Sequence, residues 1–154
     1  GPNSNATPFE RLVIDPVAKR VTRTVIDPAP QEFPRPDERL TGKPYRYAYS
    51  VALPEGADPA FMGDPRLYKH DLAAGTRQTR DFGKGKTPGE FVFVPAHANS
   101  GEDEGWLIGY VLDHAGSSTD LVILNARDFT GPAQATITIP QRIPPGFHGN
   151  FIPM

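Results

Sequence analysis

The stretch LYKHD-LAAG-TRQT, residues 67–79, reads as a strand, a tight turn and a returning strand. Asp71 stands where the turn starts, and Asx side chains favour turns because they hydrogen-bond the backbone just ahead of them. The same arrangement surrounds Asp15 and Asn125, so that the three Asx residues lie 56 and 54 residues apart. The sequence therefore contains a repeated hairpin.

The β pattern of this hairpin extends over the rest of the chain from Pro8 onward. Apolar and polar residues alternate most cleanly in residues 45–49 and 135–139, and no ten-residue segment shows a 3.6-residue apolar stripe. Nine runs have strand composition: Phe9–Ile14, Arg20–Ile26, Tyr45–Leu53, Arg66–Asp71, Thr76–Phe82, Glu90–Val94, Gly105–Asp113, Asp120–Asn125 and Ala133–Ile139. We expect an all-β protein.

The repeat length favours one particular all-β architecture. Steps of 54 to 56 residues are somewhat above the roughly 40 to 50 residues of familiar propeller blades, and two further strands between hairpins would complete a four-stranded blade. Because closure takes about four to eight blades, the chain is expected to form two to three blades of a larger propeller. Its open strand edges would then favour self-association. An open meander or a sandwich is the alternative.

Composition excludes several classes of function. The 154 residues carry 16 Lys+Arg and 18 Asp+Glu, a net charge of −2, which gives no electrostatic footprint for nucleic acid. Without cysteine, metal or nucleophilic chemistry must use His, carboxylate or hydroxyl groups. No apolar run approaches the roughly 20 residues that span a bilayer, and no signal peptide opens the chain. We expect a cytoplasmic protein, and we exclude residues 1–6 as a vector-derived tag remnant.

Four histidines are the candidate metal ligands. We expect ordinary surface or turn roles for His70, His97 and His114. His148 differs because it lies in residues 144–153, where prolines fix the backbone, glycines permit close approach and aromatic residues exclude water. Such a rigid, dry setting suits a ligating imidazole, although a histidine that caps a tight loop would have the same neighbours.

Two glutamates share an unusual context. Glu32 and Glu90 each stand directly before a phenylalanine at the start of an apolar, proline-bounded stretch. A carboxylate in such a place needs a partner, which is either the second N–H of a ligating imidazole or a nearby arginine. The candidate arginines are Arg35, Arg39 and Arg46. A hydrolase that uses the two glutamates as an acid/base pair is a further alternative, and nothing in the sequence sets their separation.

Six motifs around these positions together resemble the closing third of the carotenoid cleavage oxygenases, the family that includes retinal pigment epithelial membrane proteins. They occur in family order between about Pro8 and Met154: Glu32–Arg35, Gly42–Tyr49, Gly89–Pro95, Glu102–Leu107, Asp120–Phe129 and Phe147–Phe151. Each motif alone is weak, whereas six in order are specific.

The resemblance implies a seven-bladed propeller whose axis holds a non-haem Fe(II), bound by four histidines and no carboxylate. In that family the last ligand is the histidine of a Phe-His-Gly motif, here His148. The family also keeps glutamates that accept hydrogen bonds from ligating imidazoles. By analogy Glu90 orients His148, and Glu32 orients a ligand that this chain does not contain. The other three histidines do not lie in ligand motifs of the family.

The implied activity is cleavage of one carbon–carbon double bond of a carotenoid, apocarotenoid or stilbene-like substrate by O2, which gives two carbonyl products. The substrate tunnel and an apolar patch that makes peripheral membrane contact are expected mostly outside this segment. With one histidine ligand, the isolated chain is expected to bind no stoichiometric iron and to be inactive. A non-catalytic interaction module that recruits partners through its strand edges is the alternative.

Overall fold

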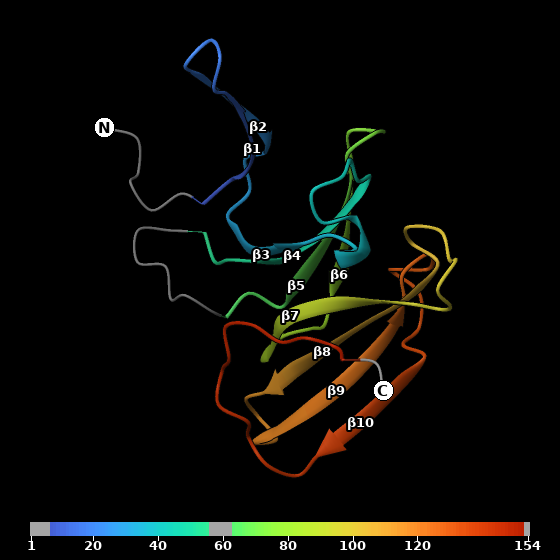
Figure 1. The fold of residues 1–154 in the computed structure, drawn as a ribbon. Helices are drawn as coiled ribbons and strands as arrows, with labels where there is room; N and C mark the ends of the chain where they lie inside the picture. The colour runs from blue at the N-terminus through green and yellow to red at the C-terminus, as the bar shows by residue number, and fades with distance from the viewer. Residues whose placement is uncertain (1–6, 56–62, 153–154) are drawn as a thin grey trace.

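Ten strands and one short 3-10 helix make up the part of the chain that the structure, a computed structural model, describes: residues 7–55 and 63–152 (Figure 1). The predicted tag remnant, residues 1–6, lies outside the described residues. The elements are β1 (Phe9–Asp15), β2 (Arg20–Asp27), β3 (Gln31–Arg35), the helix η1 (Glu38–Leu40), β4 (Tyr47–Ala52), β5 (Arg66–Asp71), β6 (Thr76–Asp81), β7 (Lys86–Pro95), β8 (Gly105–Asp113), β9 (Ser118–Asn125) and β10 (Ala135–Ile139). The predicted all-β class is confirmed.

The strands form three antiparallel sheets. Strands β3 to β6 and β7 to β10 are two four-stranded meanders, and β1 pairs with β2 alone among the described strands. The three repeated hairpins of the sequence are β1–β2, β5–β6 and β9–β10. The hairpins β5–β6 and β9–β10 each form the second half of a four-stranded sheet, and the two strands that precede each of them complete that sheet as expected.

The Asx turns explain why the hairpins repeat. Oδ1 of Asp15 accepts hydrogen bonds of 2.9 to 3.0 Å from the backbone N–H groups two and three residues ahead. The Oδ1 atoms of Asp71 and Asn125 accept the same pair of bonds at 2.9 to 3.3 Å. Asp113 makes a fourth such turn between β8 and β9. Each turn is encoded locally, by one side chain that satisfies two backbone donors.

Strand β3 is the one strand that composition did not reveal. It is an edge strand that contains Pro34, and proline is tolerated there because an edge strand has a side with no ladder hydrogen bonds to lose. Its pairing with β4 is interrupted between Glu32 and Arg35 by a bulge. Within the bulge Phe33 has a φ of 56°, in the left-handed region that non-glycine residues rarely occupy.

The hydrophobic core lies where the two four-stranded sheets face each other. The ring of Tyr49 on β4 stacks on Phe93 of β7, with centroids 6.4 Å apart and planes inclined by 7°. Leu67 of β5 and Leu107 of β8 are completely buried in the same cluster. Neither meander could bury its apolar face alone, so packing between the sheets fixes the position of β3 relative to β7.

After β10 the chain runs back to the first strand of its own sheet. We call residues 140–152 the terminal segment; Figure 1 shows it in red, passing from the end of β10 to β7. Near its start, the backbone N–H of Ile143 donates a 2.9 Å hydrogen bond to Oγ1 of Thr119 on β9. This return places the Phe147–Phe151 motif beside the Gly89–Pro95 motif. No helix in residues 7–55 and 63–152 is long and apolar enough to cross a membrane.

Candidate metal centre

Glu90 lies in a bulge of β7. The pairing of β7 with β8 is regular up to Pro88 and resumes at Phe91, so that Gly89 and Glu90 together face a single residue of β8. Phe91 lies opposite Gly109, where a Cβ atom would come within 2.4 Å of the Phe91 ring. Glycine at this position therefore lets the ring pack across β8. The Glu90 side chain is only 3% exposed.

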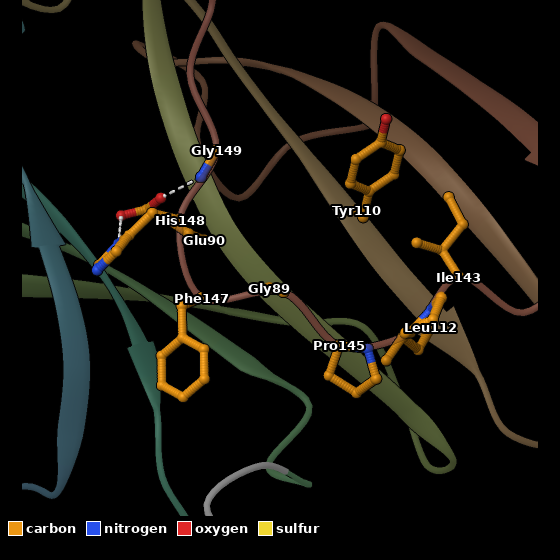
Figure 2. A pocket seen from close by; sticks show the side chains of 11 residues that line it. Gly89, Glu90, Tyr110, Leu112, Ile143, Pro145, Phe147, His148 and Gly149 are labelled. Carbon is orange, nitrogen blue, oxygen red and sulfur yellow. Dashed lines mark hydrogen bonds and ion pairs between the residues drawn. The ribbon is translucent and has the colours of Figure 1, made fainter.

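Three donors surround the Glu90 carboxylate. The backbone N–H of Gly149 donates to Oε2 at 2.9 Å, and Oε1 lies 3.3 Å from Nδ1 of His148 and 3.0 Å from a guanidinium nitrogen of Arg35. Figure 2 shows the carboxylate between the imidazole and the Gly149 nitrogen, with a dashed line to each. The buried charge is thus paired and hydrogen-bonded, which is the condition under which a carboxylate is stable out of water.

This contact favours one tautomer of the His148 ring. An ionised carboxylate only accepts hydrogen bonds, so the proton of the contact belongs to Nδ1 of His148. In the neutral ring Nε2 then carries the lone pair, and it has no partner among the described residues. A carboxylate that orients an imidazole in this way is the usual support of a metal-ligating histidine.

The surroundings of the imidazole are asymmetric. Phe33 packs edge-on against the ring, with centroids 5.4 Å apart and an interplanar angle of 79°. The His148 side chain is nevertheless 68% exposed, so the described residues do not provide the dry setting that the sequence predicts. A cavity of about 180 Å³ lies beside the site, with mainly apolar walls that include Tyr110, Leu112 and Ile143 (Figure 2).

Glu32 is placed differently from Glu90. It lies on β3 opposite Val51 and is half-buried, and its carboxylate has no hydrogen-bond or ion-pair partner in the described part of the chain. The two glutamates line separate cavities. Because Glu90 is in contact with His148, the alternative of an acid/base pair remote from that histidine has no support in this geometry.

The candidate arginines each have a partner. Arg35 pairs with Glu90, 55 residues away in sequence, and not with neighbouring Glu32. Arg39 pairs with Asp37, and Arg46 with Asp71. Both partners that the sequence offered for a buried glutamate, an imidazole and an arginine, therefore meet at Glu90.

The expectation of a surface role for His70 is wrong. Its side chain is 3% exposed, and Nε2 lies 2.7 Å from Oε1 of Gln31. The ring also contacts Phe9, with centroids 4.8 Å apart. Charged neighbours suggested an exposed strand, but β5 is an interior strand, and neighbouring Lys69 is itself buried with its Nζ bonded to the carbonyl of Ala126 at 2.7 Å.

Burial determines the protonation of His70. Desolvation lowers its pKa to about 4, and nearby Arg77 acts in the same direction, against the opposing effect of the Asp27 carboxylate. His70 is therefore neutral near pH 7 and acts as a structural hydrogen-bonding group in the interior.

His97 and His114 have the expected turn positions. The backbone of His97 exchanges hydrogen bonds with Ser100, and His114 is an exposed residue whose Nε2 lies 2.9 Å from Oγ1 of Thr87. Within residues 7–55 and 63–152, no three His, Asp or Glu side chains are grouped so that they could hold a metal ion.

Sequence reasoning missed Phe33 as a contributor to the site, and it offered Arg35 only as one of three possible arginine partners of a buried glutamate. Phe33 packs on the imidazole, and Arg35 contacts Glu90. Both residues belong to the motif Glu32–Arg35, which the sequence analysis identified. Their contacts with Glu90 and His148 span 55 or more residues, so local spacing could not predict them.

The fold and the site together define a class: propeller-type antiparallel sheets in which a buried glutamate contacts a histidine of the terminal segment. The sequence profile of the retinal pigment epithelial membrane protein family matches residues 2–153. The chain therefore belongs to this family, as the six motifs indicated.

Individual relatives agree with this assignment. The chain is 36% identical to a carotenoid cleavage oxygenase of Mycobacterium tuberculosis over 157 residues, which cover 99% of this chain and 31% of that protein. It is 35% identical to the apocarotenoid-15,15'-oxygenase of Synechocystis over 141 residues, 92% of this chain and 28% of the relative. The chain thus spans less than a third of the length of these curated relatives.

A solved structure confirms the partial propeller. The cobalt-substituted apocarotenoid oxygenase of Synechocystis superimposes with a TM-score of 0.86 at 33% identity, over 100% of this chain and 32% of that one. Similarity at this level covers both four-stranded sheets and the hairpin.

Proposed function

We propose that this chain supplies one imidazole ligand, His148, to the non-haem Fe(II) of a carotenoid cleavage dioxygenase. The observation that carries the proposal is the contact of 3.3 Å between Nδ1 of His148 and the buried Glu90 carboxylate, which leaves Nε2 available.

The residues present fit one ligand position of an iron site. A neutral imidazole is a good ligand for Fe(II). Because the His148 side chain is exposed and its Nε2 has no partner among the described residues, this nitrogen is accessible to a metal ion at the surface of the chain. Glu32 is proposed to orient a ligand contributed from outside this chain, since its half-buried carboxylate has no partner among the described residues. When bound, the iron would supply O2 activation for scission of one carbon–carbon double bond to two carbonyl products.

The chain's own groups have three tasks in this proposal. Glu90 holds the proton at Nδ1 of His148 and so leaves the lone pair of Nε2 for a metal ion. Phe33 restrains rotation of the ring by edge-on packing. Tyr110, Leu112 and Ile143 give the adjacent cavity an apolar wall, which suits a polyene or stilbene-like substrate and excludes water.

The names of the relatives support the substrate class. Carotenoid and apocarotenoid oxygenases are among the proteins that this chain matches. We propose that the whole protein forms the seven-bladed ring expected from the resemblance, acts on a carotenoid, apocarotenoid or stilbene-like substrate, and is cytoplasmic with at most peripheral membrane contact.

The isolated chain is proposed to bind no stoichiometric iron and to lack oxygenase activity, because a single imidazole binds Fe(II) weakly. Anaerobic titration of the 154-residue chain with Fe(II), with bound iron measured after desalting, is expected to give far less than one ion per chain. Tight one-to-one binding would overturn this part of the proposal. In a full-length protein, His148→Ala is expected to abolish iron retention, and normal retention would overturn the assignment of His148.

Open strand edges support a proposal about assembly. Strand β1 pairs with β2 on one side and has no strand on its other side in the described structure, and the hairpin exposes Leu12, Val13 and Ile14. We propose that the isolated chain self-associates through such edges. Sedimentation velocity over a hundredfold range of concentration tests this, since a monomer throughout would contradict it. The same edges would serve a non-catalytic interaction module, which predicts no loss of function when His148 is replaced.

A further inference from the structure

We propose that Arg35 is a positioning residue of the His148 site. Its hydrogen bonds connect the Glu90 carboxylate and the backbone after His148 to strand β3 of the other four-stranded sheet. This inference deepens the proposed function and rests on it for the role of His148, but the contacts themselves do not depend on a metal.

The Arg35 guanidinium joins three parts of the molecule. From β3, one terminal nitrogen donates to Oε1 of Glu90 at 3.0 Å and to the carbonyl oxygen of Gly149 at 3.3 Å. The other terminal nitrogen pairs with Glu38 of η1. The side chain is 18% exposed, so its contacts are partly shielded from water and compete less with solvent than a surface pair does.

These contacts hold the residue after His148 on both sides. The N–H of Gly149 is bound by Oε2 of Glu90, and its C=O is bound by Arg35, which also binds the opposite oxygen of the same carboxylate. Arginine's planar, many-donor head suits this double role. Without Arg35, the carbonyl group of Gly149 and the plane of the Glu90 carboxylate would each lose a restraint. The direction of the His148 ring depends on both.

A bulge in the backbone of β3 places two of its side chains against the terminal segment. In the Glu32–Arg35 bulge, the left-handed φ of 56° at Phe33 costs free energy, and such strain persists where the surrounding structure stabilises it. Phe33 packs on the His148 ring, and Arg35, two residues on, reaches Glu90 and Gly149. One bulge thus directs two side chains of β3 onto the terminal segment.

The experiment uses the full 154-residue chain labelled with ¹⁵N and compares Arg35→Met, Arg35→Gln, Arg35→Lys and Glu90→Gln. Two signals are read by NMR: the ring nitrogens of His148, which report the tautomer, and the exchange rate of the Gly149 amide. The matched control is Arg66→Met. Arg66 also pairs with a buried carboxylate, since two of its guanidinium nitrogens donate to the Asp64 oxygens at 2.6 and 2.8 Å. The buried His70 ring reports whether each variant is folded.

For Arg35→Met we expect Gly149 exchange to accelerate by about tenfold or more, because a hydrogen bond to a charged group is lost from a locally opening segment. The His148 ring is expected to lose its single Nδ1–H tautomer, while Arg66→Met leaves both signals unchanged. Arg35→Lys retains the charge and is expected to recover part of the effect. If Arg35→Met does not fold, Arg35→Gln carries the same expectation.

The outcomes separate the two proposals. Unchanged signals in folded Arg35→Met and Arg35→Gln, together with altered signals in Glu90→Gln, would overturn the role of Arg35 and leave that of Glu90 intact. Unchanged signals in all of these variants would overturn the orienting role of Glu90 as well. Loss of the tautomer in the Arg35 variants with partial recovery in Arg35→Lys supports Arg35 as a positioning residue.

Discussion

Oε1 of Glu90 lies 3.3 Å from Nδ1 of His148, although 58 residues of sequence separate them. The contact joins a bulge of β7 to the terminal segment that returns from β10. The packing of the chain thus brings the imidazole and the carboxylate together.

Glu90→Gln is expected to lower the free energy of unfolding by about 1 to 3 kcal/mol. The substitution removes the negative charge that pairs with Arg35 and leaves one acceptor oxygen where two now serve Arg35, His148 and the Gly149 N–H in a mostly buried place. Urea unfolding followed by circular dichroism measures the change. The control is Glu10→Gln, which breaks a pair with an arginine whose side chain is 65% exposed and should leave the urea midpoint nearly unchanged. Equal effects of the two variants would show that the buried pair has no special role.

His70 should make the protein sensitive to mild acid. Its folded-state pKa of about 4 lies below the ordinary value of 6.5. Between these two pH values the imidazole is protonated in the unfolded chain and neutral in the folded chain. Stability is thus intact above pH 6.5 and falls as the pH drops towards 4, by up to about 3 kcal/mol from this residue. Urea midpoints at pH 7.0, 5.5 and 4.5 test this, with His70→Gln as reference. Parallel pH curves for the two proteins would contradict the prediction.

Tyr49→Phe is expected to leave stability unchanged or to raise it by about 1 kcal/mol. The Tyr49 ring is buried between Phe93 and Phe129, and its hydroxyl has no hydrogen-bond partner among the described residues. Removing an unsatisfied buried hydroxyl relieves a desolvation cost. Tyr49→Ala, which also removes the ring, should cost about 3 to 5 kcal/mol. Thermal unfolding of both variants separates the effects; a clear loss in Tyr49→Phe would mean that a water molecule satisfies the hydroxyl.

Gly109→Ala is expected to destabilise the protein by about 1 to 3 kcal/mol because the new methyl group overlaps the Phe91 ring. Since Phe91 follows Glu90 directly, the Glu90–His148 contact should also weaken, visible as a shift of the His148 ring signals. Gly146→Ala is the matched control: a Cβ there meets no atom within 4 Å, and the residue lies in the terminal segment itself. If the two alanine variants behaved alike, the packing of Phe91 across β8 would not be important.

Local signals in the sequence predicted much of the fold. Alternation in residues 135–139 and strand composition in eight other runs anticipated nine of the ten strands. The strand they missed, β3, contains Pro34 and a bulge, so neither composition nor alternation marks it. His70 was misplaced because its charged neighbours suggested solvent, whereas the sheets and the β1–β2 hairpin cover it.

Local signals were enough to predict the turns, nine of the ten described strands and the repeat near 55 residues, and motif context marked His148, Glu90 and Glu32 as candidates. The turns follow from hydrogen bonds that act within a few residues, as at Asp15 and Asp71. Only the tertiary structure decided that Arg35 belongs with Glu90 and that Glu32 stays unpaired among the described residues. The reason is physical: the packing of one sheet against the other, and the return of the terminal segment to β7, determine which distant side chains meet.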